Sequence, residues 1–348
     1  MLENRSSLIG LTRDDFVRLC RQCDAKPIHA IGLTANIFRH GNTNIDDMAD
    51  LPASLREHIK RQTCIPDVRI SHSMRSMDGT TKLLLELADG GRVECVLIPG
   101  KERLTLCIST QQGCAMGCDF CLTARAGLSR HLDTGEMVAQ VRLAQTEAGR
   151  EKIRNLVLMG MGEPLHNYDE VARFVRIATD PVGMAFSPRR VTVSTVGLVP
   201  AIRRMAEDHL LCNLAVSLNA TTNDVRSRIM PVNRRYPIAD LIDAVRYFAD
   251  TTGRRVLIEY VLLAGINDAD EDAHRLCELL YGISCTVNLL PFNGFAESNY
   301  RCPADARVST FRAILSRAGF VAVVRESRGR DILAACGQLF SQIQVRAA

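Results

Sequence analysis

The stretch GCAMGCDFC, residues 113–121, places three of the chain's thirteen cysteines within eight residues. Cys114, Cys118 and Cys121 have the spacing C-x3-C-x2-C. A structural zinc site normally has four ligands, and no second cysteine pair lies nearby in the sequence. Iron-sulfur clusters are held by thiolates, usually four, so three thiolates leave one iron open. The triplet therefore predicts an iron-sulfur cluster with a free iron, in preference to a cysteine-rich loop without a ligand.

Outward from the triplet, short β-rich runs alternate with helical stretches. The runs are LTLCIST, NLVLMGM, RVTVSTVG, NLAVSLNA, RVLIEYVLL and SCTVNLLPFN. Strands with continuous apolar sequence that alternate with helices are typical of parallel βαβ units. Six such units before the tail predict an α/β fold with a partial (β/α)6 barrel, and the triplet follows its first strand. In such barrels the chemistry lies at the C-terminal ends of the strands.

The sequence around the barrel predicts three further regions. Residues 1–65 are mostly polar with helical spacing, which indicates a small helical accessory domain. Residues 66–100 contain two strand-like runs around ADGG, which predicts a β-hairpin extension. Residues 101–300 would form the barrel, and residues 301–348 a C-terminal helix, a strand and a tail.

Composition describes an ordinary globular protein of 348 residues, with 47% hydrophobic residues and a net charge of +4. No apolar run has the length of a membrane span, and the first residues lack the pattern of a signal peptide. We therefore expect a cytoplasmic protein without membrane contact, in which cysteines serve as ligands or reactive thiols. The weak basic charge and several arginine pairs favour a nucleic-acid partner only slightly.

Several other segments carry a resemblance to a known family. Phe120 precedes the last cysteine of the triplet, and the chain also contains RLTLCISTQQGC, MGMGEPLHN, RRVTVSTVGLVP, NLLPFN and RGRDILAACGQL. Together, from about Glu94 to Leu339, they resemble the RlmN/Cfr family of radical S-adenosylmethionine (SAM) RNA methyltransferases. The resemblance implies a 4Fe-4S cluster on the three cysteines. Its open iron would chelate SAM, which is cleaved to a 5′-deoxyadenosyl radical.

The same resemblance assigns roles to two distant cysteines and one glutamate. Cys336 would carry the methyl group as an S-methylcysteine intermediate, with two SAM molecules used per turnover. Cys107 would resolve the protein–RNA thioether by forming a transient disulfide with Cys336, and Glu94 would accept a proton. Without the resemblance, both cysteines would be interpreted as packing residues and Glu94 as a solvent-facing carboxylate on a hairpin strand.

Polar residues and glycines at successive strand ends match the cofactor-binding positions of the family. They could instead be helix caps or turn residues, but their recurrence at strand ends favours one shared site. Family members commonly have histidine where this chain has asparagine at position 219. The expected cofactor-binding residues are Gly162, Glu163, Ser194, Ser217, Leu218, Asn219 and Asn293.

The resemblance implies methylation of an adenosine ring carbon in RNA, with C2 favoured. The expected target is adenosine 2503 of 23S ribosomal RNA, with transfer RNA as a further substrate, a flavodoxin-type electron donor and a monomeric enzyme. The alternatives are C8 methylation, another RNA, a radical SAM enzyme that does not methylate, and a non-catalytic iron-sulfur or zinc RNA-binding module.

Overall fold

The protein is built around one large mixed sheet, seen in a computed structural model that describes residues 5–100, 103–149, 153–296 and 298–340. Within these residues the sheet has ten strands in the order β14-β13-β12-β11-β10-β9-β6-β5-β4-β3. The strands from β6 to β14 run parallel. They are β6 (Leu104–Cys107), β9 (Ile153–Leu158), β10 (Val191–Thr195), β11 (Asn213–Ser217), β12 (Val256–Leu262), β13 (Cys285–Pro291) and β14 (Ala322–Val324).

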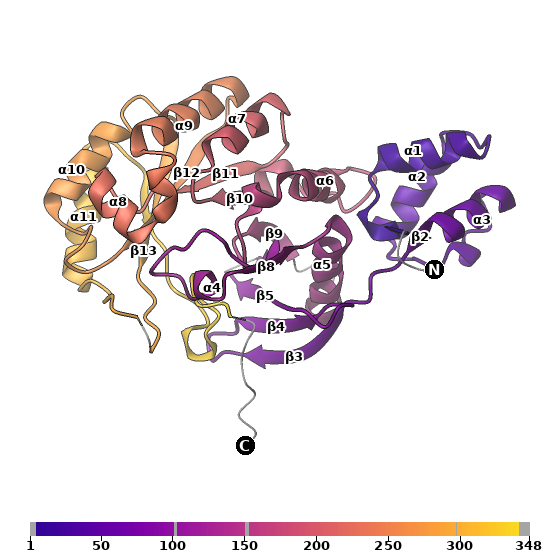
Figure 1. Ribbon diagram of the computed structural model, residues 1–348, viewed down its shortest axis with the longest axis horizontal. Helices are drawn as coiled ribbons and strands as arrows, with labels where there is room; N and C mark the ends of the chain where they lie inside the picture. The colour runs from indigo at the N-terminus through magenta and orange to yellow at the C-terminus, as the bar shows by residue number, and fades with distance from the viewer. Residues whose placement is uncertain (1–4, 101–102, 150–152, 297, 341–348) are drawn as a thin grey trace, which may run out of the picture.

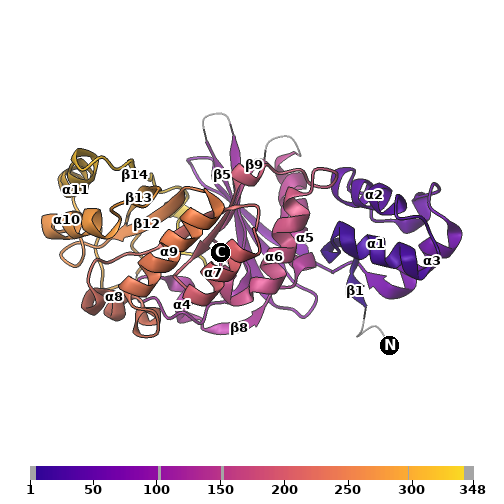
Figure 2. The same ribbon diagram turned by 90° about the horizontal axis from the view of Figure 1, so that it is seen from above.

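Six helices connect the successive parallel strands, and Figures 1 and 2 show them as a row along the sheet. They are α5 (Thr134–Ala148), α6 (Tyr168–Thr179), α7 (Val199–Glu207), α9 (Ile238–Thr252), α10 (Asp270–Leu279) and α11 (Asp305–Arg317). The sheet stays open, with β14 at one edge and β3 at the other. The six strand–helix units confirm the predicted partial (β/α)6 barrel.

Apolar burial explains why these segments take up their positions. The side chains of Leu156, Val193, Leu214, Ile258 and Val287 come from five neighbouring strands, and each is fully buried. The connecting helices present apolar faces to them, so strands and helices share one continuous core. Burial of apolar surface on both faces of a parallel sheet is the main stabilising contribution of this architecture.

Three antiparallel strands extend the sheet beyond the barrel. They are β3 (Arg69–Arg75), β4 (Thr81–Glu86) and β5 (Arg92–Pro99), and β5 joins the barrel through antiparallel pairing with β6. Strands β4 and β5 are the runs from which a hairpin was expected. The sequence did not indicate β3, because RISHSMR is polar and mostly exposed, as suits an edge strand that must resist pairing with other chains.

The N-terminal part is helical and lies at one end of the molecule, beside α5 and α6 (Figures 1 and 2). Its helices are α1 (Arg13–Gln22), α2 (His29–Thr34) and α3 (Ala53–Gln62), with a two-stranded sheet of β1 (Ser6–Ser7) and β2 (Thr63–Cys64). An ion pair of 2.7 Å between Asp15 and Arg173 joins α1 to α6. In the described part of the chain, no helix is long and apolar enough to cross a membrane.

Short elements complete the end of the barrel at which the strands finish. They are β7 (Gln111–Gly113) paired with β8 (Leu128–His131), α4 (Leu122–Arg125) and α8 (Asn223–Ile229). After β14 the tail turns back over this end. Its Asp331 accepts hydrogen bonds from Ser76 Oγ (2.6 Å) and from the Met77 amide (3.2 Å) in the β3–β4 turn. The tail therefore bridges the antiparallel extension and the barrel.

Candidate active site

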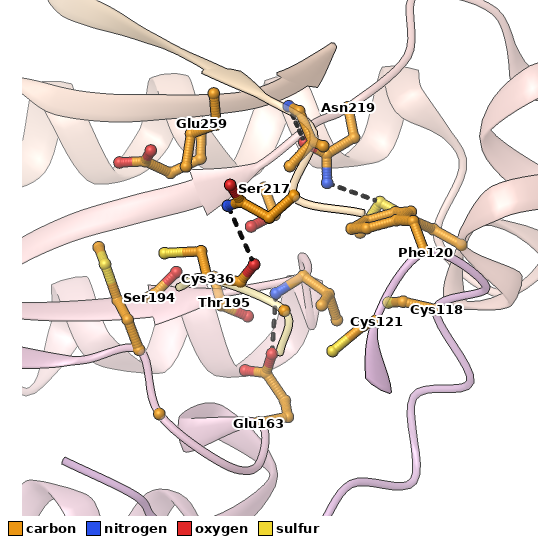
Figure 3. A pocket seen from close by; sticks show the side chains of 18 of the residues that line it. Cys118, Phe120, Cys121, Glu163, Ser194, Thr195, Ser217, Asn219, Glu259 and Cys336 are labelled. Atoms are coloured by element: carbon orange, nitrogen blue, oxygen red, sulfur yellow. Dashed lines mark hydrogen bonds between the residues drawn. The ribbon is translucent and has the colours of Figure 1, made fainter. Parts of the chain in front are cut away.

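A cavity of about 170 Å³ lies at the C-terminal ends of strands β9 to β13. It collects residues from the cysteine loop, from these five strand ends and from the tail, and Figure 3 shows their side chains facing one space. Parallel strands bring their C-terminal ends to one edge of the sheet, which is where a barrel builds its site. Of the residues expected from the sequence, those that line this cavity are Cys118, Cys121, Gly162, Glu163, Ser194, Ser217, Asn219, Asn293 and Cys336.

The cysteine loop runs between β7 and α4. Cys114 and Cys118 are buried and Cys121 is partly exposed toward the cavity. Burial raises the pKa of Cys114 to about 12 and that of Cys118 well above its usual range, so both thiols are neutral until a metal displaces the proton.

The donor set fits an iron-sulfur cluster. No three metal-ligating side chains among the described residues converge on a single ion. A cluster takes one thiolate per iron, so its ligands do not need to meet at a point, and thiolates are the donors it requires. Two buried thiols and one partly exposed thiol, all on one loop beside a cavity, supply that set.

Gly162 and Glu163 follow β9 and form the floor of the cavity. Gly162 has φ +104°, and an added Cβ would lie 2.6 Å from the side chain of Gln111, so only glycine fits there. The carboxylate of Glu163 accepts hydrogen bonds from the amides of Leu165 (3.0 Å) and Val196 (2.8 Å). Burial raises the pKa of Glu163 from 4.5 to about 7, although these hydrogen bonds lower it.

Strand register brings polar side chains together across the sheet. Ser217 on β11 is paired with Glu259 on β12, which in turn is paired with Asn288 on β13. Asn288 Nδ2 donates to Glu259 Oε1 at 2.7 Å, and burial raises the pKa of Glu259. Glu259 lines the cavity, and the sequence interpretation missed it. The available signal was a lone carboxylate inside the apolar run RVLIEYVLL.

Asn219 has a conformation that explains why asparagine is suitable there. Its φ is +57°, a left-handed value that asparagine adopts more readily than most residues. Its Oδ1 accepts a hydrogen bond from the Val261 amide at 2.8 Å, and its Nδ2 lies 3.3 Å from Met230 Sδ. The side chain of neighbouring Leu218 is buried in the core and does not line the cavity. The Leu218 side chain is therefore not available to a ligand in this cavity.

The tail places Cys336 opposite the cysteine loop. The Leu122 amide, directly after Cys121, donates to the Gly337 carbonyl at 2.7 Å. Asn293 Nδ2 lies 3.5 Å from the Cys336 carbonyl. Figure 3 shows Cys118 and Cys121 on one side of the cavity and Cys336 on the other. Cys336 is exposed and lines this cavity, and desolvation of its thiol by the surrounding protein raises its pKa to about 11.

A second cavity, of about 110 Å³, lies behind Cys336 and is lined by both Cys336 and Cys107. Arg325 and Arg328 also line it, and burial raises the pKa of Cys107. Both cysteines are free thiols, so the disulfide expected between them is not formed in this structure. The expectation concerned a bond present for only part of a reaction cycle, and the structure holds the reduced pair.

Glu94 is fully buried on β5, which rules out its interpretation as a solvent-facing carboxylate. Its Oε1 lies 3.1 Å from Lys82 Nζ, and its Oε2 accepts from the Phe340 amide at 2.8 Å. Lys82 Nζ also donates to the Leu333 carbonyl at 3.3 Å. Burial raises the pKa of Glu94 and Lys82 opposes that rise. This ion pair therefore holds the tail on both sides of Cys336, and Glu94 lines neither cavity.

Comparisons with known proteins agree with this geometry. A radical SAM superfamily model matches residues 108–277, the region that carries the cysteine loop and most strand ends. A crystal structure of a radical SAM methyltransferase from Sphaerobacter thermophilus has a TM-score of 0.88 at 42% identity, over 97% of this chain and all of that one. These matches define the class: a radical SAM enzyme.

The family follows from similar sequences of nearly equal length. A probable dual-specificity RNA methyltransferase RlmN from Moorella thermoacetica is 43% identical, over 97% of this chain and 98% of that protein. The dual-specificity RNA methyltransferase RlmN from Syntrophus aciditrophicus is 44% identical, over 97% of each. The chain belongs to the RlmN family of radical SAM RNA methyltransferases.

Proposed function

We propose that this protein methylates a ring carbon of an adenosine in RNA, with C2 favoured, and that Cys336 carries the methyl group. The observation that supports this best is the position of Cys336 between two cavities. One cavity contains Cys118 and Cys121 of the triplet, and the other contains Cys107. A cysteine that first accepts a methyl group and is later attacked by a second thiol must be accessible from both cavities.

The cofactor site is proposed at the strand ends. Cys114, Cys118 and Cys121 would hold a 4Fe-4S cluster. When bound, the cluster and SAM supply the methyl group and the carbon radical for the reaction. Glu163 would bind the amino group of SAM, since its carboxylate lines the cavity and retains acceptor capacity beyond its two backbone hydrogen bonds. Polar contacts would come from Ser194, Ser217, Asn219 and Asn293, and close backbone contacts from Gly162 and Leu218.

The three remaining roles belong to residues around the tail. The Cys336 thiolate, formed by loss of its proton, would take the methyl group by displacement. Once the methyl carbon on Cys336 has been joined to the base, Cys107 would attack the Cys336 sulfur and form the disulfide. The electron pair of the broken carbon–sulfur bond would stay with the new carbon on the base, which takes up a proton from water to become the methyl group. An external reductant must return both thiols. Glu94 would accept the proton from the adduct carbon, which requires the tail to move, because Phe340 and Lys82 occupy its carboxylate.

RNA is proposed to reach the second cavity. An adenosine that has left its stack can present its ring to Cys336 there, with Arg325 and Arg328 beside its phosphates. The helical N-terminal part would hold the RNA by shape and phosphate contacts. Because the relatives are named dual-specificity enzymes, we propose adenosine 2503 of 23S ribosomal RNA together with transfer RNA. The enzyme would act as a monomer in the cytoplasm, with a flavodoxin-type electron donor.

Nucleoside mass spectrometry of ribosomal and transfer RNA, from strains with and without this protein, tests the proposal. We expect 2-methyladenosine to disappear with the protein and to return with the intact chain, but not with a Cys336→Ser variant. Loss of 8-methyladenosine would instead identify C8 as the target. No change in either nucleoside would contradict the proposed RNA substrate.

A further inference from the structure

Arg226 on α8 is a buried cation for which the described residues provide no opposing charge. It is 0% exposed and is the largest fully buried side chain of the described chain. Its hydrogen-bond acceptors are the carbonyls of Val196, Ser217 and Leu218 and the amide oxygen of Asn233. None of them is a carboxylate. A buried charge with only neutral partners lowers the stability of the fold. We therefore expect an anion near Arg226 that these residues do not supply.

The surroundings of Arg226 indicate where such an anion would lie. Helix α8 packs against the cysteine loop, since the Asp119 amide donates to the Ile229 carbonyl at 3.0 Å. Cys118 packs beside Ile229 and Met230 in one apolar cluster. A Cys118 thiolate would favour the charged form of Arg226, while burial lowers the pKa of Arg226 to about 10. The helix that carries Arg226 therefore lies against the cysteine loop, whose thiols become negatively charged when they bind a metal.

The hydrogen bonds of Arg226 also reach the residues that line the first cavity. Its Nη2 donates to the Val196 carbonyl at 2.6 Å, and the amide of the same residue donates to Glu163. Nη2 also donates to the Ser217 carbonyl at 3.3 Å, and Nε to the Leu218 carbonyl at 2.9 Å. One guanidinium thus fixes the ends of β10 and β11, and through Val196 the carboxylate of Glu163.

We propose that Arg226 is the internal counter-cation of the iron-sulfur cluster and the positioning residue for the two strand ends that bind SAM. Three thiolates, the SAM carboxylate and the electron gained on reduction all bring negative charge into this region. A nearby buried cation stabilises the reduced state more than the oxidised one, because the interaction acts in a low dielectric. Net charge around a cluster is one of the factors that set its potential. The inference rests on the proposed function, since it assumes that the triplet holds the cluster.

Two variants separate the effect of the Arg226 charge from the effect of its hydrogen-bonding geometry. Arg226→Gln removes the charge, and Arg226→Lys keeps the charge but cannot make the same fork of hydrogen bonds. Anaerobically reconstituted proteins would be titrated with reductant, with the cluster followed by electron paramagnetic resonance. SAM affinity would be measured by the spectral change on binding. Arg203→Gln is the control, because it removes an arginine from an exposed ion pair on α7.

We expect the midpoint potential to shift to more negative values in Arg226→Gln and to stay at the wild-type value in Arg226→Lys and Arg203→Gln. SAM binding should weaken about tenfold or more in both Arg226 variants, since each loses charged hydrogen bonds to the strand ends. Wild-type potential and affinity in Arg226→Gln would overturn the inference, and so would equal potential shifts in both variants. If the metal-free forms of both Arg226 variants unfold, the role of Arg226 is structural only, which would also overturn the inference. A wild-type chain that takes up no cluster would instead contradict the proposed function.

Discussion

Cys336 and Cys107 line one cavity, although one lies in the tail and the other at the end of the first barrel strand. Both are reduced thiols with raised pKa values. The proposed disulfide therefore requires that Cys107 loses its proton and that the Cys336 sulfur carries a carbon leaving group, since two thiols alone form no disulfide without an oxidant.

Cys107→Ala should trap RNA on the protein, because the thioether at Cys336 can then no longer be released by a neighbouring thiol. The expected result is a nuclease-sensitive band of higher mass in denaturing gels of protein incubated with RNA, SAM and reductant. Cys212→Ala is the matched control, since Cys212 is equally buried but lines neither cavity. Intact RNA methylation without any adduct in Cys107→Ala would remove Cys107 from the mechanism.

Lys82→Met should lower the free energy of unfolding by about 3–5 kcal/mol, because it leaves the fully buried carboxylate of Glu94 without its partner. The double variant Lys82→Met, Glu94→Gln should recover a large part of this loss, since no buried charge then remains. Denaturant unfolding of the wild type, of Lys82→Met, of Glu94→Gln and of the double variant gives the coupling between the two residues.

An exposed ion pair on the same antiparallel extension serves as the comparison. Arg69 and Glu86 lie 2.6 Å apart, and the Arg69 side chain is 68% exposed. The equivalent cycle on this pair should give a coupling below about 1 kcal/mol. Similar coupling energies for the two pairs would show that the Lys82–Glu94 contact does not hold the tail as described.

Glu163 should make the stability of the metal-free protein depend on pH. Its pKa is raised from 4.5 to about 7 in the folded chain, so its contribution is fully present below pH 4.5 and is lost as pH rises through about 7. The full shift corresponds to about 3 kcal/mol. A plot of unfolding free energy against pH should therefore be flatter for Glu163→Gln than for the wild type across this range. Identical pH profiles would mean that Glu163 is ionised with an ordinary pKa.

Gly162→Ala should weaken SAM binding and lower stability, because its Cβ would lie 2.6 Å from Gln111 at φ +104°. We expect a loss of about 2 kcal/mol or more in unfolding free energy. Gly265→Ala tests the backbone contribution alone, since Gly265 has φ +69° but no atom within 4 Å of an added Cβ. That variant should lose about 1 kcal/mol and bind SAM normally. Equal behaviour of the two variants would contradict a close approach at Gly162.

The sequence predicted the barrel because each strand is a short apolar run and each connection has helical spacing. It did not predict β3, since an exposed edge strand carries no apolar pattern to detect. The position of Glu94 was undecided for a similar reason. Alternation along β5 put Glu94 opposite Val93 and Cys95, but both faces of this strand are covered, and the buried partner Lys82 comes from β4.

The candidate site was predictable where residues follow one another on strand ends, as Ser194 and Ser217 do. Glu259 and Arg226 were missed, because their roles depend on register and on carbonyls of distant segments. The sequence also could not show that the Leu218 side chain lies in the core and not in the cavity. Long-range packing of the tail decides that Cys336 faces the cysteine loop, and local sequence does not encode it.

Peptide mass spectrometry would show whether Cys336 carries the methyl group. Reconstituted protein would be incubated with methyl-labelled SAM, digested and analysed for modified cysteines. We expect labelled methyl on Cys336 in the wild type and in Cys107→Ala, and none on Cys107. RNA that becomes methylated while Cys336 remains unlabelled, or methylation that survives in Cys336→Ser, would contradict this role of Cys336.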